Sequence, residues 1–285
     1  MTVQRAFGIF FLGSAIVYAI VMMRSIRKDR EWLMAAPGKI GVLMPAEGIL
    51  FFLCSMGLPD FVMNTILCQN LHLTTPEHQP DCNIAATIVP SGIISFLYLS
   101  HAGAVDAPLL VTFLLCVVTG CFAGTYARTR MPGDGVRRAM ILLMGITFLC
   151  LIVKMVLSAG TVTEAVSLRG WRLGVIGAAG FGAGFINMLG IPAKPLTATV
   201  ALLLGLSPIT TLALTLGAVP FSGVVGGVHV ARARNYNPKL ILSAMTAGSI
   251  AAACGCMLAV SIPAPVLNGI ILAAIGLAIV SLVRK

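Results

Sequence analysis

Charged residues are scarce in this sequence. Only 10% of the 285 residues are Asp, Glu, Lys or Arg, and 58% are hydrophobic, whereas a soluble domain carries about 25% charged residues. Several uncharged runs are long enough to cross a bilayer, which takes about 20 residues. These runs span 6–23, 84–100, 107–127, 173–193 and 240–283, and prolines divide the last into two. The lack of charge excludes an ordinary soluble domain and predicts an all-α polytopic membrane protein.

Patterns of catalysis and metal binding are also missing. The sequence has no Walker phosphate loop, no HExxH, no GxSG and no Asp-rich helical pair. None of the eight cysteines forms a CxxC pair, and Cys254 and Cys256 lack His or acidic neighbours at metal-ligand spacing. The polar stretch 72–82 fits no standard metal site, so we interpret it as a solvated loop. We therefore expect no enzyme, no cofactor and no metal site, which leaves transport without ATP hydrolysis.

The net charge of +10 does not indicate nucleic-acid binding. Basic residues form short clusters at 24–39, 128–138 and 232–239 and at the end of the chain. These clusters flank apolar runs and have no interleaved aromatic residues, as is typical of topology signals. The first apolar run has no A-x-A cleavage site and more positive charge after it than before it. We expect a retained helix whose N-terminus lies outside.

The second half of the sequence repeats the first at a distance of about 131–133 positions. Gly57-Leu58-Pro59 aligns with Gly190-Ile191-Pro192, and Gly124 aligns with Gly255. The ordered series of matches predicts two copies of one unit. We divide the chain into an N-terminal helix with a basic loop (1–37), a first repeat (38–160) and a second repeat (170–285).

The basic clusters indicate how the repeats cross the membrane. The positive-inside rule places all four clusters in the cytoplasm. The rule is satisfied if segments 40–73 and 173–206 each enter the membrane to its middle and return to the side from which they came. The two units are then inverted, each a re-entrant broken helical hairpin plus three transmembrane helices, after one extra N-terminal helix. A topology in which every run spans fully misplaces two basic clusters, and we favour the re-entrant one.

The two Gly-x-Pro breaks carry the candidate site. Proline suits the first turn of a helix, so each break predicts a half-helix that starts at mid-membrane. Helix N-termini offer free N–H donors and partial positive charge, and two that face each other suit an anion. The predicted substrate-binding residues are Gly57, Leu58, Pro59, Asp60, Asn187, Gly190, Ile191, Pro192, Ala193, Lys194 and Thr197.

Two charged and two polar residues in these segments have two interpretations each. Lys194 is either a counter-charge for an anion or the partner of Asp60, and a pair of the two could be exchanged for substrate. Glu47 is either a coupling site for protons or a shallow residue at the cytoplasmic mouth, which we favour slightly. Asn187 and Thr197 either contact the ligand or bond backbone and neighbouring helices.

These features resemble the sulfite exporter TauE/SafE family. The resemblance is carried by LGVIGAAGFGAGFINMLGIPAKPLTATVALLLGLSP (173–208) and SGVVGGVHVARARNYNPKLILSAMTAGSIAAACG (222–255). The family's run of consecutive glycines at the break is absent, and the N-terminal helix and the 74–83 loop look like additions. The resemblance implies a carrier of small sulfur oxyanions or organosulfonates in the bacterial inner membrane.

Together these observations predict a multi-pass secondary transporter for a small anion, most consistent with sulfite or an organosulfonate. Its expected partners are the anion and the lipid bilayer, and no nucleic acid. The sequence leaves open a coupling proton or sodium ion and a homodimer. The rival hypotheses are a cation or metal carrier that uses Glu47, Asp60 and Cys54, and a membrane scaffold that transports nothing.

Overall fold

The structure is a computed structural model, and its described part is helical. It describes residues 3–56, 58, 60–101, 105–128, 130, 165–189, 193–206 and 230–259, with isolated positions at 142, 146, 149, 153, 210, 211, 214, 215, 218, 219 and 227. In this part, four helices are long and apolar enough to cross a membrane: Arg5–Lys28, Gln79–Ser100, Ala107–Ala127 and Pro238–Ala259. The predicted all-α multi-pass membrane protein is thereby confirmed.

The first helical hairpin consists of α3 (Ile40–Ser55) and α4 (Asp60–Asn70). The helix ends at Ser55 and a new one begins at Asp60, so the chain breaks where Gly57-Leu58-Pro59 predicts it; Gly57 and Pro59 themselves lie outside the described residues. The side-chain amide of Asn237 donates to Pro37 O at 3.0 Å and to Leu73 O at 3.1 Å. These carbonyls precede α3 and follow α4, so the hairpin starts and ends at the same place.

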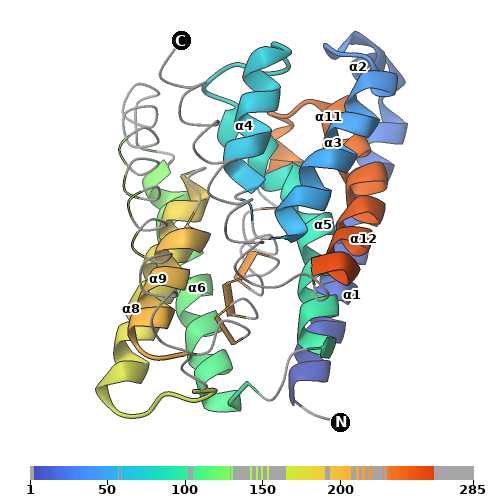
Figure 1. Cartoon of the computed structure of the whole chain (residues 1–285). Coiled ribbons are helices and arrows are strands. Elements are labelled where there is room, and N and C mark those ends of the chain that lie inside the picture. Colours follow the sequence, from blue (N-terminus) through green and yellow to red (C-terminus); the bar gives the residue numbers. More distant parts are fainter. Residues whose placement is uncertain are drawn as a thin grey trace.

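The second hairpin consists of α8 (Trp171–Met188) and α9 (Lys194–Leu203). Its break contains Gly190-Ile191-Pro192, which lies outside the described residues. Ala165, before α8, forms a parallel bridge with Leu206, after α9. This hairpin too returns to the place from which it starts, and Figure 1 shows the bases of the two hairpins at opposite ends of the molecule.

Long helices surround the hairpins. They are α1 (Val3–Lys28), α5 (Gln79–His101), α6 (Ala107–Arg128) and a composite of α11 (Pro238–Ser243), a π-helical turn (Ala244–Gly248) and α12 (Ser249–Ala259). In Figure 1, α6, α8 and α9 lie together on the left, and α1, α3, α5 and α12 lie together on the right. The described helices therefore form two groups, and each hairpin belongs to a different one.

Each hairpin packs on a long helix of the other half of the sequence. The α3 helix packs on α12, and α8 packs on α6. A Cβ atom at Gly255 would collide with the carbonyl oxygen of Phe52, and one at Gly124 would collide with that of Phe185. Glycine at these two positions lets the backbones approach closely, as is common between membrane helices. Gly124 and Gly255 are partners in the sequence repeat, so equivalent residues make equivalent contacts.

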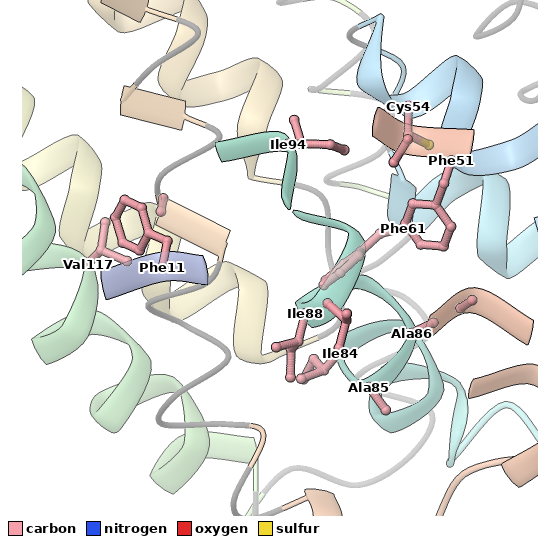
Figure 2. Packing of buried hydrophobic residues seen from close by; sticks show 14 of the residues in the cluster. Phe11, Phe51, Cys54, Phe61, Ile84, Ala85, Ala86, Ile88, Ile94 and Val117 are labelled. Atoms are coloured by element: carbon pink, nitrogen blue, oxygen red, sulfur yellow. The ribbon is translucent and has the colours of Figure 1, made fainter. Parts of the chain in front are cut away.

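The hydrophobic core includes residues of both groups of helices. Phe51 and Cys54 of α3 lie beside Phe61 of α4, and Ile84 and Ile88 project from α5 (Figure 2). All five side chains are buried. This packing fixes the first hairpin against α5, and so determines where the polar residues at the start of α4 lie.

A short helix clamps the N-terminal segment to the second half. This helix, α2 (Arg30–Ala35), is capped by Asp29, whose carboxylate accepts from Trp32 N at 3.0 Å. Asp29 also pairs with Arg234 at 3.0 Å, and Lys239 Nζ donates to Ala36 O at 2.6 Å. The loop before α11 is thus held against the segment that leads into the first hairpin.

Candidate functional site

The tips of the two hairpins meet in an ion pair. Nζ of Lys194 lies 2.7 Å from Oδ2 of Asp60, across 134 positions of sequence. Asp60 is the first residue of α4 and Lys194 the first of α9. The Asp60 side chain is 3% exposed and that of Lys194 16%. The pairing interpretation of Lys194 is therefore correct for this state of the protein.

The N-terminus of α4 stabilises the charge of Asp60, whereas the N-terminus of α9 repels the charge of Lys194. Asp60 Oδ1 accepts from Phe61 N at 3.1 Å, and a carboxylate is favoured at the positive end of a helix. Lys194 adds a full positive charge to the partial positive charge at the start of α9, which is the unfavourable end for a cation. The start of α9 is consequently electropositive, and it needs a negative partner. In this structure that partner is Asp60.

The predicted polar residues near the second break are Thr197 and Asn187. The Thr197 hydroxyl donates to Ala193 O at 3.0 Å within the first turn of α9, so the backbone interpretation is confirmed for Thr197. Asn187 is buried in the last turn of α8, where its carbonyl oxygen accepts from Leu189 N. Leu58 and Ala193 are both buried. Lys194 is thus the residue at this tip with a charge to offer a ligand.

Glu47 is a second buried carboxyl group in the first hairpin. Its exposure is 0%, and neither carboxyl oxygen has a hydrogen-bond partner among the described residues. Complete burial removes Glu47 from solvent in this structure, and its role as a coupling site or as a shallow residue at the cytoplasmic mouth stays a prediction. Cys54 lies two turns further along α3 and interacts electrostatically with Glu47, Asp60 and Lys194. Glu47 therefore lies on the α3 face that leads to the ion pair.

Asn64 extends the polar face of α4. It follows Asp60 by one helical turn and is fully buried. Its Oδ1 accepts from Cys68 Sγ at 3.6 Å, while its Nδ2 has no partner among the described residues. Buried polar atoms normally find partners. The orphaned donor of Asn64 and the orphaned acceptors of Glu47 together mark the first hairpin as more than a packing element.

Sequence reasoning missed a polar network between α4 and α5. Asn83 Nδ2 donates to Thr65 Oγ1 at 2.9 Å, and Gln79 Nε2 donates to Asn83 Oδ1 at 2.8 Å. Thr87 continues the line by donating to Asn83 O at 2.9 Å. The available signal was a polar residue at every fourth position, 79, 83 and 87, which puts all three on one helix face.

The expected solvated loop at 72–82 is partly wrong. The α5 helix already begins at Gln79, and Asp81 and Cys82 in its first turn are buried. Cys254 of α12 is exposed. Within the described residues, no group of three or more His, Cys, Asp or Glu side chains could hold a metal ion.

A comparison with protein-family models shows the family to which the chain belongs. The model of the family "Sulfite exporter TauE/SafE" matches residues 71–283, which is well over half of the chain. The chain belongs to the sulfite exporter TauE/SafE family. Membership confirms the resemblance carried by the 173–208 and 222–255 segments, and it implies a membrane transporter of sulfite or related anions. The comparisons with curated proteins and with solved structures gave no match.

The TauE/SafE match covers the two hairpins unequally. It includes Lys194 and the whole second hairpin, whereas it begins at residue 71, after the last residue of α4. Glu47 and Asp60 lie outside it. The cationic half of the ion pair thus stands in the part of the chain that carries the family pattern, and the acidic half stands in the part that does not.

Proposed function

We propose that this TauE/SafE protein is a secondary transporter of a small anion, sulfite or an organosulfonate, which binds Lys194 in exchange for Asp60. The observation that carries the proposal is the buried Lys194–Asp60 pair at the junction of the two hairpin tips. An anion with tetrahedral or pyramidal oxygens can take the place of the carboxylate against the ammonium group. The free N–H groups at the starts of α4 and α9 can donate to its other oxygens.

The membrane arrangement in this proposal is an inverted repeat with two re-entrant hairpins. The support comes from the hairpin bases at opposite ends of the molecule and from the equivalent contacts of Gly124 and Gly255. Irregular backbone at membrane depth is tolerated where it is buried in protein or lines a cavity, and the described residues of the two breaks are all buried: Met56, Leu58, Leu189 and Ala193. We place the basic clusters in the cytoplasm of a bacterium and the helices in its inner membrane.

Alternating access follows from the two groups of helices. The ion pair joins α4 of one group to α9 of the other. When an anion replaces Asp60 at Lys194, this link between the groups is broken. The groups can then rock against each other and expose the site to the opposite side, as in other transporters built from inverted repeats.

Glu47 is the proposed uptake point for a coupling proton. An unpartnered carboxylate in an apolar interior is costly, so a buried carboxyl group of this kind is suited to bind and release a proton.

The rival cation carrier has less support. Its three ligands would be Glu47, Asp60 and Cys54, but Asp60 is bound to an ammonium group, which repels a metal ion. The scaffold hypothesis leaves both the buried pair and the family match without an explanation.

Flux of labelled sulfite and methanesulfonate into proteoliposomes tests the proposal. Wild-type protein should carry at least one of them, and Lys194→Ala should reduce the flux to that of empty vesicles. Arg234→Gln is the matched control, because it removes a basic ion-pair partner at the exposed clamp. Thermal stabilisation of purified protein by the same anions reports binding separately from transport. Full flux in folded Lys194→Ala contradicts the anion site, and flux of cations in place of anions supports the rival carrier.

A further inference from the structure

We infer that each anion is carried together with one proton, and that the carboxyl group of Asp60 holds this proton. The inference rests on the proposed function and adds to it the coupling ion, its stoichiometry and its site. It starts from the geometry of the exchange. When an anion binds Lys194, the Asp60 carboxylate loses its partner.

The environment of Asp60 makes that step expensive for a charged carboxylate. Oδ2 contacts Lys194 Nζ at 2.7 Å, and Oδ1 accepts from the backbone N–H of Phe61 at 3.1 Å. The side chain is 3% exposed. Among the described residues, the hydrogen-bond donor that remains when an anion takes Lys194 is the backbone N–H of Phe61. Breaking a buried ion pair by removing one partner is strongly destabilising, because the other charge is left uncompensated.

Other groups near Asp60 do not replace the lost positive charge. From α3 the Cys54 thiol interacts with Asp60, and Glu47 interacts with that thiol. From α5, Tyr98 donates its hydroxyl to Ser55 O at 2.9 Å. Further titratable groups on the packed helices are Cys68 on α4 and Asp81 and Cys82 on α5. All of these are neutral or acidic, so Lys194 is the cation that faces Asp60 in the described part of the chain.

A proton on Asp60 restores the balance of charge. As the contact between Oδ2 and Nζ breaks, one O–H bond forms on the Asp60 carboxyl, and the anion neutralises Lys194. With a monovalent anion, the buried site then holds the same net charge before and after binding. On the other side of the membrane the anion leaves, Asp60 releases the proton, and the ion pair forms again. Glu47 is the proposed uptake point and passes the proton toward Asp60. During transport of the anion, Asp60 and not Glu47 holds the proton.

Two measurable consequences follow. Anion affinity should increase as the pH falls, by roughly tenfold per pH unit while one proton is taken up per anion. Transport of a monovalent sulfonate should be electroneutral, so an imposed membrane potential should not change its rate. Methanesulfonate is the better probe where it is carried, because its sulfonate stays ionised across this range. When sulfite is the probe, the protons are counted at a pH above the pKa of sulfite, so that protons bound by sulfite do not enter the count.

The experiment counts protons and labelled anions in the same proteoliposomes, with a pH dye inside the vesicles. Wild-type protein should show about one proton per anion. In Asp60→Asn the anion should still bind Lys194 and move, but without a proton and with a rate that follows the membrane potential. Asp60→Glu keeps a carboxyl group and should keep the coupling. Glu47→Gln should slow the flux and leave the ratio unchanged.

The controls separate failure of this inference from failure of the proposed function. Asp29→Asn removes a carboxylate from the exposed ion pair and should leave the ratio and the rate unchanged. The wild-type ratio needs no variant, so poor folding of Asp60→Asn does not prevent the test. Two results overturn the assignment of the proton to Asp60 and leave the proposed function standing. One is anion flux without protons in wild type, and the other is coupling that is lost in Glu47→Gln and kept in Asp60→Asn. Absence of any anion flux in wild type overturns the proposed function and this inference with it.

Discussion

In the described part of the chain, two ion pairs connect the first half to the second, and they differ in their surroundings. Asp60–Lys194 lies at the hairpin tips with side-chain exposures of 3% and 16%, and Asp29–Arg234 lies at the clamp with 38% and 42%. Arg234 has further contacts, with the Trp32 ring at 5.3 Å and Ser25 Oγ at 3.5 Å. The exposed pair loses little when one partner leaves, because water and neighbours replace it, whereas the buried pair depends on its two members.

The difference in burial explains how an ion pair can hold two segments together at the clamp and act as a switch at the hairpin tips. At the clamp, the ion pair is one of several contacts that hold α2 and the loop before α11 together. At the hairpin tips, the pair joins two groups of helices, and we propose that an anion competes for it. Burial therefore makes the contact suitable for a switch.

The largest effect is expected from Lys194→Ala. It leaves Asp60 buried without a counter-charge, which should lower the free energy of unfolding by about 3–5 kcal/mol and abolish anion flux. Denaturation in detergent and flux in proteoliposomes measure the two effects. Arg234→Ala is the matched change in the exposed pair. An equal loss of stability in both variants would remove the distinction between the pairs.

The double variant Asp60→Asn/Lys194→Gln should recover much of the stability lost in Lys194→Ala but none of the flux. Both charges are gone, so no uncompensated charge remains, while the anion has lost its partner. A double-mutant cycle should give a coupling energy above about 2 kcal/mol for this pair and below about 1 kcal/mol for the exposed pair. Additive effects at the buried pair would contradict the strong contact.

Glu47→Gln should change stability by no more than about 1 kcal/mol, although the residue is completely buried. Glu47 has no ion-pair partner among the described residues, so its removal strands no charge. Thermal denaturation compared with that of Asp60→Asn distinguishes the two carboxyl groups. A loss as large as that of Lys194→Ala would show that Glu47 is a charged, paired residue.

Asp29→Asn should have the smallest effect, with a loss of less than about 1 kcal/mol that shrinks as salt is added. The buried pair is screened much less, so the stability of wild type relative to Lys194→Ala should change little over the same salt range. Denaturation at low and high ionic strength measures both. A strong salt dependence of the buried pair would place it in contact with solvent.

The sequence predicted the parts of the molecule that follow from local chemistry. Uncharged runs located α1, α5, α6 and the composite helix that ends with α12, and the Gly-x-Pro patterns located both helix breaks. The family was predicted from the second hairpin, which the family match covers. These features depend on residues that are neighbours in the chain.

Features that depend on which helices pack together were not predictable in this way. Glu47 is completely buried, and its local sequence does not distinguish a buried position from a shallow one at the cytoplasmic mouth. Asn237 joins two loops about 160–200 positions away, and nothing in its local sequence indicates those partners. The Asp60–Lys194 pair was foreseen as one of two alternatives because the repeat brings the two breaks together.

The affinity of Asp60→Asn for the transported anion tests the central claim most directly. If the anion replaces Asp60 at Lys194, removal of the competing carboxylate should tighten binding at neutral pH by at least about tenfold, or 1.4 kcal/mol. Titration of the purified variant and of wild type with the same anion gives the ratio. Weaker binding by folded Asp60→Asn would mean that Asp60 helps to hold the anion, and it would contradict the exchange.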